Sequence, residues 1–225
     1  MIKNDNPWAG FKHSEYMVHP DDVASFENHN NRVKLEHKFI PFLAPEPWIG
    51  NVESKVVILL ANPGATKENL AGKRERNTFR QELAIKNLNM ENMEHPHYFL
   101  DPSLLSDPGG KWWRTALGRL IKDTSLEKVS QNVLSLEALP YHSRYFEVPA
   151  LEIPTQRFTA QLLREAVNRD AFIVIYRQLD YWISQVPELK NYPRKTLNPI
   201  NIQRVWITPG NLRNGYEQIV ELLTN

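Results

Sequence analysis

The feature that most constrains the fold of this chain is an aliphatic run that ends in a turn. The run Lys55-Val56-Val57-Ile58-Leu59-Leu60-Ala61 is followed directly by Asn62-Pro63-Gly64. Such a run predicts a strand buried on both faces, as the central strands of parallel sheets are. Asn-Pro-Gly is a turn signal, and ligands of open α/β sheets bind at the carboxyl ends of the strands. The side chain of Asn62 is therefore expected at a ligand site.

Three other short apolar runs, with helical patterns between and after them, complete the prediction of an α/β fold. Strands are expected at residues 132–138, 171–176 and 204–207, and residues 156–168 carry one apolar face at helical spacing. This alternation predicts three layers, α/β/α, in which helices cover both faces of a central four-stranded parallel sheet.

The length of 225 residues suits one domain. Residues 41–225 are expected to form it, and residues 1–40, which are polar and irregular, are expected to pack on its core as an extension. Three loops, at residues 62–64, 137–143 and 208–213, follow expected strands. Because the carboxyl ends of parallel strands share one edge of a sheet, these loops predict a site at that edge.

The composition excludes several classes of chemistry. The chain has no cysteine, which rules out disulfides, thiolate zinc sites, cysteine nucleophiles and cysteine-held iron–sulfur clusters. No apolar run approaches the roughly 18–20 residues of a membrane helix, and the first residues lack the apolar segment of a secretory signal. We therefore expect a cytoplasmic protein without a membrane partner, and we expect it to be a monomer. The net charge of +1 limits any nucleic-acid site to a local patch.

Motifs for cofactors and metals are also missing from the sequence. It contains neither a Gly-x-x-x-x-Gly-Lys loop nor a Gly-x-Gly-x-x-Gly motif, which argues against P-loop and Rossmann nucleotide binding. His95-Pro96-His97 has a spacing found in metal sites, but no carboxylate or cysteine partner accompanies it. We expect no cofactor and no metal.

Two further patterns have a functional and a structural interpretation. A basic stretch after the Asn-Pro-Gly turn could contact a nucleic-acid backbone, but acidic residues alternate with it, which favours a solvated helix face. Trp112-Trp113 could stack on a base, but their helical spacing favours packing in the core. The basic stretch consists of Lys67, Lys73, Arg74, Arg76, Arg80 and Lys86.

The order of strands and turns resembles the uracil-DNA glycosylase superfamily over residues 41–225. The first motif of that family takes forms such as Gly-Gln-Asp-Pro-Tyr-His and Gly-Ile-Asn-Pro-Gly, and Leu60-Ala61-Asn62-Pro63-Gly64 is similar to the second form. Its last motif, His-Pro-Ser-Pro-Leu-Ser, opens the final helix, and Thr208-Pro209-Gly210-Asn211-Leu212-Arg213 occupies that place. The resemblance implies an enzyme that flips a nucleotide into a pocket and cleaves its N-glycosidic bond.

The resemblance gives roles to the residues of the first turn. Asn62 matches the residue that positions water against the anomeric carbon, although an amide has no ionisable group and barely deprotonates water. The alternative is a turn residue that bonds to its own backbone. Gly64 stands where uracil-specific enzymes carry a tyrosine that excludes 5-substituted bases, so it leaves room for a larger base. The alternative is that the turn requires the conformational freedom of glycine.

Glu137 departs most from the family, which has at this place an asparagine that reads uracil. An ionised glutamate can only accept hydrogen bonds, so it would repel O4 of uracil. It would suit a base edge with two donors, such as N1–H and N2–H of guanine or protonated cytosine. We therefore expect a base other than uracil. The alternative is that Glu137 pairs with Arg144 or another cation at the sheet edge.

The last turn also departs from the family. Thr208 replaces the histidine that stabilises O2 of the base, and it supplies one neutral donor unless His142 provides an imidazole from the neighbouring loop. The alternative for His142 is a solvated loop residue. Leu212 matches the leucine that fills the space left by the flipped base, although it could equally be an ordinary apolar residue of a first turn. Arg213 could contact a phosphate.

These residues lead to one expected function and two alternatives. The expected function is a glycosylase that removes a flipped non-uracil or modified base from single- or double-stranded DNA. The first alternative is a nucleic-acid-binding module of the same fold that has lost catalysis, because Glu137 and Thr208 are substituted. The second is a small-molecule nucleoside- or nucleotide-binding protein, which the near-neutral charge favours.

Overall fold

The computed structural model describes residues 2–73, 78–197 and 204–225, and its centre is a mixed five-stranded sheet. The strand order is β1-β3-β2-β4-β5, in which β1 runs antiparallel to β3 and the other neighbours are parallel. The α/β class and the four parallel strands agree with the sequence, whereas the antiparallel edge strand was not predicted. The strands are β1 (Trp48–Ile49), β2 (Val56–Leu59), β3 (Val133–Leu136), β4 (Phe172–Ile175) and β5 (Lys195–Leu197).

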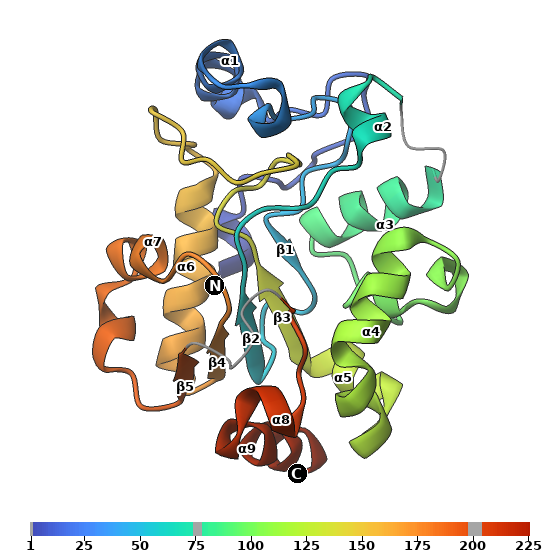
Figure 1. Cartoon of the computed structure of the whole chain (residues 1–225), viewed down its shortest axis with the longest axis vertical. Helices are drawn as coiled ribbons and strands as arrows, with labels where there is room; N and C mark the ends of the chain where they lie inside the picture. The colour runs from blue at the N-terminus through green and yellow to red at the C-terminus, as the bar shows by residue number, and fades with distance from the viewer. Residues whose placement is uncertain (1, 74–77, 198–203) are drawn as a thin grey trace.

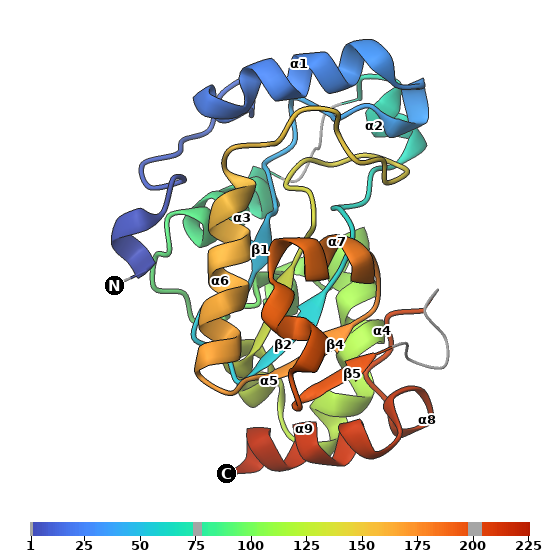
Figure 2. The ribbon, with the colours of Figure 1, turned by 90° about the vertical axis from the view of Figure 1, so that its left-hand side faces the viewer.

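Helices cover both faces of this sheet and give three layers (Figure 1). Helices α6 and α7 pack on one face, and α3, α4, α5 and α9 pack on the other. Figure 2 shows α6 and α7 in front of the sheet, with α1 across one end of the molecule and α9 at the other. The helices are α1 (Val23–Arg32), α2 (Lys67–Leu70), α3 (Thr78–Leu88), α4 (Pro108–Asp123), α5 (Leu126–Asn132), α6 (Gln156–Asn168), α7 (Leu179–Gln185), α8 (Pro209–Leu212) and α9 (Asn214–Thr224).

Strand β2 is the central strand that the aliphatic run predicts. All four of its residues are buried, between the parallel neighbours β3 and β4. Val57 and Leu59 belong to the core on the α6 side, and Val56 and Ile58 belong to the core on the α4 side. A strand buried on both faces needs apolar residues at every position, which explains the unbroken run.

The strand expected at residues 204–207 is wrong. Residues 204–207 form no strand. The backbone N–H of Ile207 donates to the carbonyl of Ala116 in α4, and the N–H of Trp206 donates to the carbonyl of Arg204. Val205 and Ile207 are buried and Trp206 between them is exposed, which reproduces the alternation of a strand. The fourth parallel strand is instead β5, a short polar edge strand that offers no apolar run.

The N-terminal segment packs against the main core. Trp8, Phe26 and Phe39 belong to the same buried cluster as the sheet face under α6. Asp22, which is fully buried, accepts hydrogen bonds from Tyr141 Oη (2.7 Å), Thr155 Oγ1 (2.6 Å) and Thr155 N (3.0 Å). This carboxylate connects the N-terminal segment to two residues that follow β3 in the sequence, Tyr141 and Thr155.

Replacing Asp22 with alanine tests that junction. The variant leaves three buried donors of Tyr141 and Thr155 without an acceptor, so we expect the free energy of unfolding to fall by about 3 kcal/mol or more. Asp21→Ala is the matched control: its side chain is 70% exposed, and we expect a change below about 0.5 kcal/mol. Urea denaturation measures both, and similar small losses for the two variants would show that Asp22 is not a junction.

Candidate functional site

A pocket of about 750 Å³ lies at the carboxyl ends of β2, β3 and β4. Asn62 and Gly64 line it from the turn after β2, Glu137 lines it from the end of β3, and Arg177 lines it from the end of β4. Its volume lies in the range of small-molecule sites, and its place is the one where ligands of open α/β sheets bind. The structure therefore brings three of the residues selected from the sequence to one pocket.

The turns after β2 and β3 are held together by hydrogen bonds that continue the pairing of the two strands. Leu139 N–H donates to Ala61 (3.0 Å), and Ser143 N–H donates to Pro63 (3.1 Å). Gly64 and Ser143 form an isolated parallel bridge. The convergence expected for these two loops is therefore confirmed, and their backbones form a rigid wall of the pocket.

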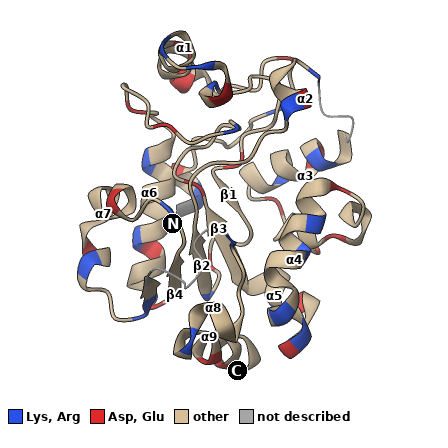
Figure 3. Cartoon of the chain, viewed as in Figure 1, with Lys and Arg blue, Asp and Glu red and all other residues tan. Residues whose placement is uncertain are grey.

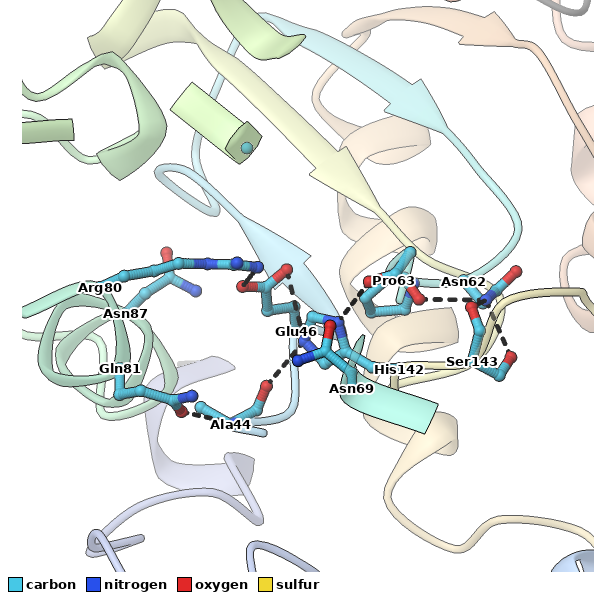
Figure 4. Close-up of polar contacts among 12 residues, drawn as sticks. Ala44, Glu46, Asn62, Pro63, Asn69, Arg80, Gln81, Asn87, His142 and Ser143 are labelled. Atoms are coloured by element: carbon cyan, nitrogen blue, oxygen red, sulfur yellow. Dashed lines mark hydrogen bonds and ion pairs between the residues drawn. The ribbon is translucent and has the colours of Figure 1, made fainter. Parts of the chain in front are cut away.

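Asn62 connects the same two turns through its side chain (Figure 4). Its Nδ2 donates to the carbonyl (2.9 Å) and the Oγ (3.0 Å) of Ser143, and to the carbonyl of Pro63 (3.1 Å). The bond to Pro63 is the local backbone contact expected for a turn residue. Because the amide nitrogen is committed to these acceptors, Oδ1 is the atom with which Asn62 can accept a hydrogen bond from a water in the pocket.

Gly64 is not required by its backbone conformation or by close packing. Its φ lies outside the left-handed region, and a Cβ added at this position would meet no atom within 4 Å. The alternative that the turn needs glycine is therefore wrong in this structure. What the missing side chain leaves is space, and that space belongs to the pocket.

His142 supports the turn from behind the pocket and does not line it. Its ring is buried, with Nδ1 2.9 Å from the carbonyl of Gly64 and Nε2 3.1 Å from the carbonyl of Ala44. Burial lowers the pKa of His142, and the nearby carboxylate of Glu46 only partly opposes this effect. A neutral imidazole donates to one of these carbonyls, so His142 is neither solvated nor directed at a ligand.

Glu46 is a buried carboxylate of the pocket that its neighbours keep ionised. Its Oε1 accepts from Arg80 Nη2 (3.1 Å) and from Tyr98 Oη (2.7 Å), and its Oε2 lies 3.7 Å from His142 Nε2 (Figure 4). Burial alone would raise the pKa of Glu46, but the charge of Arg80 and the hydrogen bonds from Arg80 and the Tyr98 hydroxyl outweigh burial, and its pKa lies below the usual value.

Glu137 lies beside Glu46 but has the opposite electrostatic environment. The antiparallel pairing of β1 and β3 continues into a hydrogen bond from Glu137 N–H to Pro47, which places Glu46 next along the chain. Glu137 is 5% exposed, and its Oε2 has no hydrogen-bond partner among the described residues. Burial raises the pKa of Glu137 well above its usual value, the charge of Glu46 adds to the rise, and Arg177 offsets part of it.

This environment changes the chemistry expected for Glu137. An ionised Glu137 was expected from the sequence, whereas burial beside another carboxylate favours the protonated form. Arg144, the cation suggested as its partner, interacts with the ring of Tyr145 and does not line the pocket. A protonated carboxyl both donates and accepts one hydrogen bond.

The residues of the last turn lie elsewhere. Thr208 caps α8 by accepting from Asn211 N–H (3.3 Å), and Leu212 is buried in the core on the α4 side. Arg213 is exposed beyond α8. Both views place α8 beside α9, at the end of the molecule opposite α1 and α2 (Figures 1 and 2). The expectation that this loop meets the other two is therefore wrong, because residues 205–207 run along α4 instead of forming a strand of the sheet.

Several lining residues were not selected from the sequence. Arg80, expected on a solvated helix face, has a side chain only 16% exposed and pairs with Glu46. Trp113 packs in the core as expected, but Trp112 is 46% exposed at the pocket. A charged residue between two prolines just before a buried segment was the available signal for Glu46. Arg74 and Arg76 of the basic stretch lie outside the described residues.

The first turn of α4 positions Trp112. Asp107 caps this helix by accepting from the N–H groups of Gly109 and Gly110, and Pro108 is its first residue. Gly110 lies so close to the Leu104 carbonyl that no Cβ fits there. The cap and this close approach fix the start of the helix that carries Trp112, a lining residue of the pocket.

Charges are distributed over helices on both sides of the sheet and are not gathered on one of them (Figure 3). Lys73, Arg80 and Arg177 nevertheless share the pocket with Glu46 and Glu68. In the described part of the chain, no group of three or more His, Asp or Glu side chains could hold a metal ion. Nor does that part contain a helix with the length and apolarity to cross a membrane.

Replacing Gly64 and Gly110 with alanine tests the interpretation of the free space. Gly64→Ala should raise the free energy of unfolding by about 0.4–1 kcal/mol, because alanine restricts the unfolded chain without strain in the folded one. Gly110→Ala, whose Cβ would clash with the Leu104 carbonyl, should lower it by more than about 1 kcal/mol. Chemical denaturation measures both. A loss above about 1 kcal/mol for Gly64→Ala would restore the view that the turn needs glycine.

Glu137→Gln tests the protonated state through stability. The raised pKa means that the folded protein keeps a proton that the unfolded chain releases, so wild-type stability falls as pH rises from the usual carboxyl pKa towards the raised one. Glutamine removes this dependence. We expect the free energy of unfolding of the variant, relative to that of the wild type, to rise by more than about 1 kcal/mol from pH 5 to pH 8. Each tenfold change in proton affinity is worth about 1.4 kcal/mol. Glu82→Gln, an exposed change on α3, should follow the wild type. A constant difference between wild type and Glu137→Gln across this range would contradict the protonated state.

No protein-family model, no curated protein sequence and no solved structure matches this chain. The chemistry of the pocket's own side chains is therefore the basis on which a function is proposed.

Proposed function

We propose that the pocket binds a base rotated out of a DNA strand and that the protein hydrolyses the N-glycosidic bond of that base. The observation that carries this proposal is the convergence of Asn62, Gly64 and Glu137 on one pocket of about 750 Å³. In the glycosylase resemblance, Asn62 positions the water, Gly64 leaves space for the base, and Glu137 reads the edge of the base.

The proposed reaction needs a water held at the anomeric carbon. Asn62 Oδ1 accepts a hydrogen bond from that water and orients it, while the bonds from Nδ2 to Ser143 hold the amide in place. The water oxygen bonds to the anomeric carbon, the bonding pair of the carbon–nitrogen bond leaves with the base, and the proton of the water ends on the base nitrogen. Because an amide is a very weak base, orientation and not deprotonation is the contribution of Asn62.

The pocket also has the features of a single-strand binding site. Trp112 presents an exposed indole at its edge, and bases stack on such rings without regard to sequence. Lys73 and Arg177 add positive charge where a phosphate backbone would approach. A local patch of this kind suits a chain whose net charge is only +1.

The pocket gives only partial stabilisation to the negative charge that develops on the departing base. A neutral Glu137 repels an anionic base less than a carboxylate would, and Arg177 contributes a positive charge to the same pocket. Neither His142 nor Thr208 lines the pocket, so the histidine that the family uses at the leaving base has no counterpart among its described lining residues. The proposed excision is therefore slow.

The same observation favours a second candidate function, a module that binds a flipped base without cleaving it. The lining residues supply space, stacking surface and an edge-reading carboxyl, but the residue at the water-positioning place is an amide, Asn62, which cannot act as a general base. Such a module would recognise the base and leave the glycosidic bond intact.

An excision assay on oligonucleotides with one modified base separates these two functions. We expect the wild type to release the base in single-turnover reactions with excess protein. Asn62→Ala should lower this rate by about 100-fold or more, because the water loses its orienting acceptor. Asn191→Ala, an exposed asparagine far from β2 in the sequence, is the matched control and should keep the wild-type rate.

The readouts are the free base by mass spectrometry and strand cleavage at the abasic site after alkali. Binding without release, equal for wild type and Asn62→Ala, would establish the module. Affinity for free nucleosides with no salt-dependent affinity for oligonucleotides would reject both in favour of a small-molecule protein.

A further inference from the structure

Among the described residues that line the pocket, Glu137 has a buried side-chain oxygen without a hydrogen-bond partner. The residue is fixed at the end of β3: its N–H donates to Pro47, and its carbonyl accepts from the side chain of Gln156. The carboxyl lines the pocket, yet Oε2 is buried and has no hydrogen-bond partner in the described part of the chain. A buried polar atom left in this state indicates a missing partner.

The charges around this carboxyl determine where a proton resides. The charged groups that line the pocket with it are Glu46, Glu68, Lys73, Arg80 and Arg177. Glu46 receives hydrogen bonds from Arg80 and Tyr98, so it is the carboxylate that stays ionised. Two carboxyl groups that share a low-dielectric site do not both ionise, and Glu137, whose buried Oε2 receives no donor from the described residues, keeps the proton.

We infer that Glu137 reads the base as a neutral carboxylic acid, so that the site takes a base edge on which one donor lies beside one acceptor. This inference rests on the proposed function and gives it a substrate class. An N–H next to a carbonyl, as in hypoxanthine or thymine, presents such an edge. The acid donates to the carbonyl and accepts from the N–H, which completes both oxygens of Glu137. An edge of two donors, which suits a carboxylate, leaves the acid proton without an acceptor.

The space at Gly64 widens the range of bases that fit. Gly64 lines the pocket, and a Cβ added to it would meet no atom within 4 Å. Purines and pyrimidines with a donor–acceptor edge, with or without a 5-substituent, therefore belong to the class, and the reason for expecting a base other than uracil, an ionised Glu137, no longer holds.

The binding test compares two bases that differ by one amino group. Fluorescent single strands of one sequence carry hypoxanthine, guanine or an abasic analogue at one central position, and their dissociation constants are measured at pH 7. For the neutral acid we expect hypoxanthine and guanine to bind within about threefold of each other, and both to bind more tightly than the abasic strand. An ionised Glu137 would instead favour guanine, whose N1–H and N2–H offer two donors, by about tenfold or more, the worth of one good hydrogen-bonded pair.

Variants identify the proton as the cause. Glu137→Gln keeps one donor and one acceptor and should retain the binding pattern, whereas Glu137→Met, of similar size, should bind both bases no better than the abasic strand. Glu82→Gln on α3 is the control for loss of an unrelated carboxyl. The proton itself is read by infrared difference spectroscopy between wild type and Glu137→Gln, as a protonated-carboxyl stretching band that the variant lacks.

The outcomes separate this inference from the proposed function. Absence of the carboxyl band, or a tenfold preference for guanine that Glu137→Gln abolishes, overturns the neutral acid and leaves base binding in place. A carboxyl band without any preference of the wild type for base-containing over abasic strands overturns the proposed function and removes the base as the partner of Glu137.

Discussion

The pairing of β2 with β3 beyond the ends of both strands is the constraint on which the site depends. Two polar turns would ordinarily diverge after leaving a sheet, but here backbone bonds to Ala61 and Pro63 keep them parallel. Asn62 takes its orientation from this pairing, since its amide nitrogen bonds to Ser143 in the opposite turn. The wall of the pocket is thus an extension of the sheet and shares its rigidity, which is the support that a site for orienting water needs.

The pocket also shows how one register can separate the properties of two identical functional groups. The antiparallel edge strand β1 places Glu46 and Glu137 on neighbouring stretches of backbone. Arg80 and Tyr98 reach Glu46, and none of the described hydrogen-bond donors reaches Oε2 of Glu137. One carboxyl is therefore stabilised as an anion and the other as an acid, which is the division of labour found where two titratable groups share a site.

The sequence predicted those parts of the fold whose signal is continuous. The unbroken run of β2 and the helical spacing of α6 were sufficient, because burial on both faces and a single apolar stripe each leave a direct pattern. The polar edge strand β5 leaves no such pattern, and residues 204–207 imitate one because alternate residues pack on α4. Of the site, Asn62 and Glu137 followed from the geometry of parallel strands. Glu46 did not, because the two residues of β1 give no signal of their register.

The bond network of Asp22 has a consequence for how the chain reaches this structure. Its partner Thr155 lies 133 residues further along the chain, and Tyr141 lies 119 residues further. During synthesis the N-terminal segment leaves the ribosome long before either partner exists, so it must wait unpaired until β3 and the loop after it have formed. Contacts of such large separation slow folding, since the entropy of closing the loop is lost before the contact contributes. The N-terminal segment is thus among the last to reach its native packing. Until it does, Trp8 and Phe26 are exposed to water and to other chains.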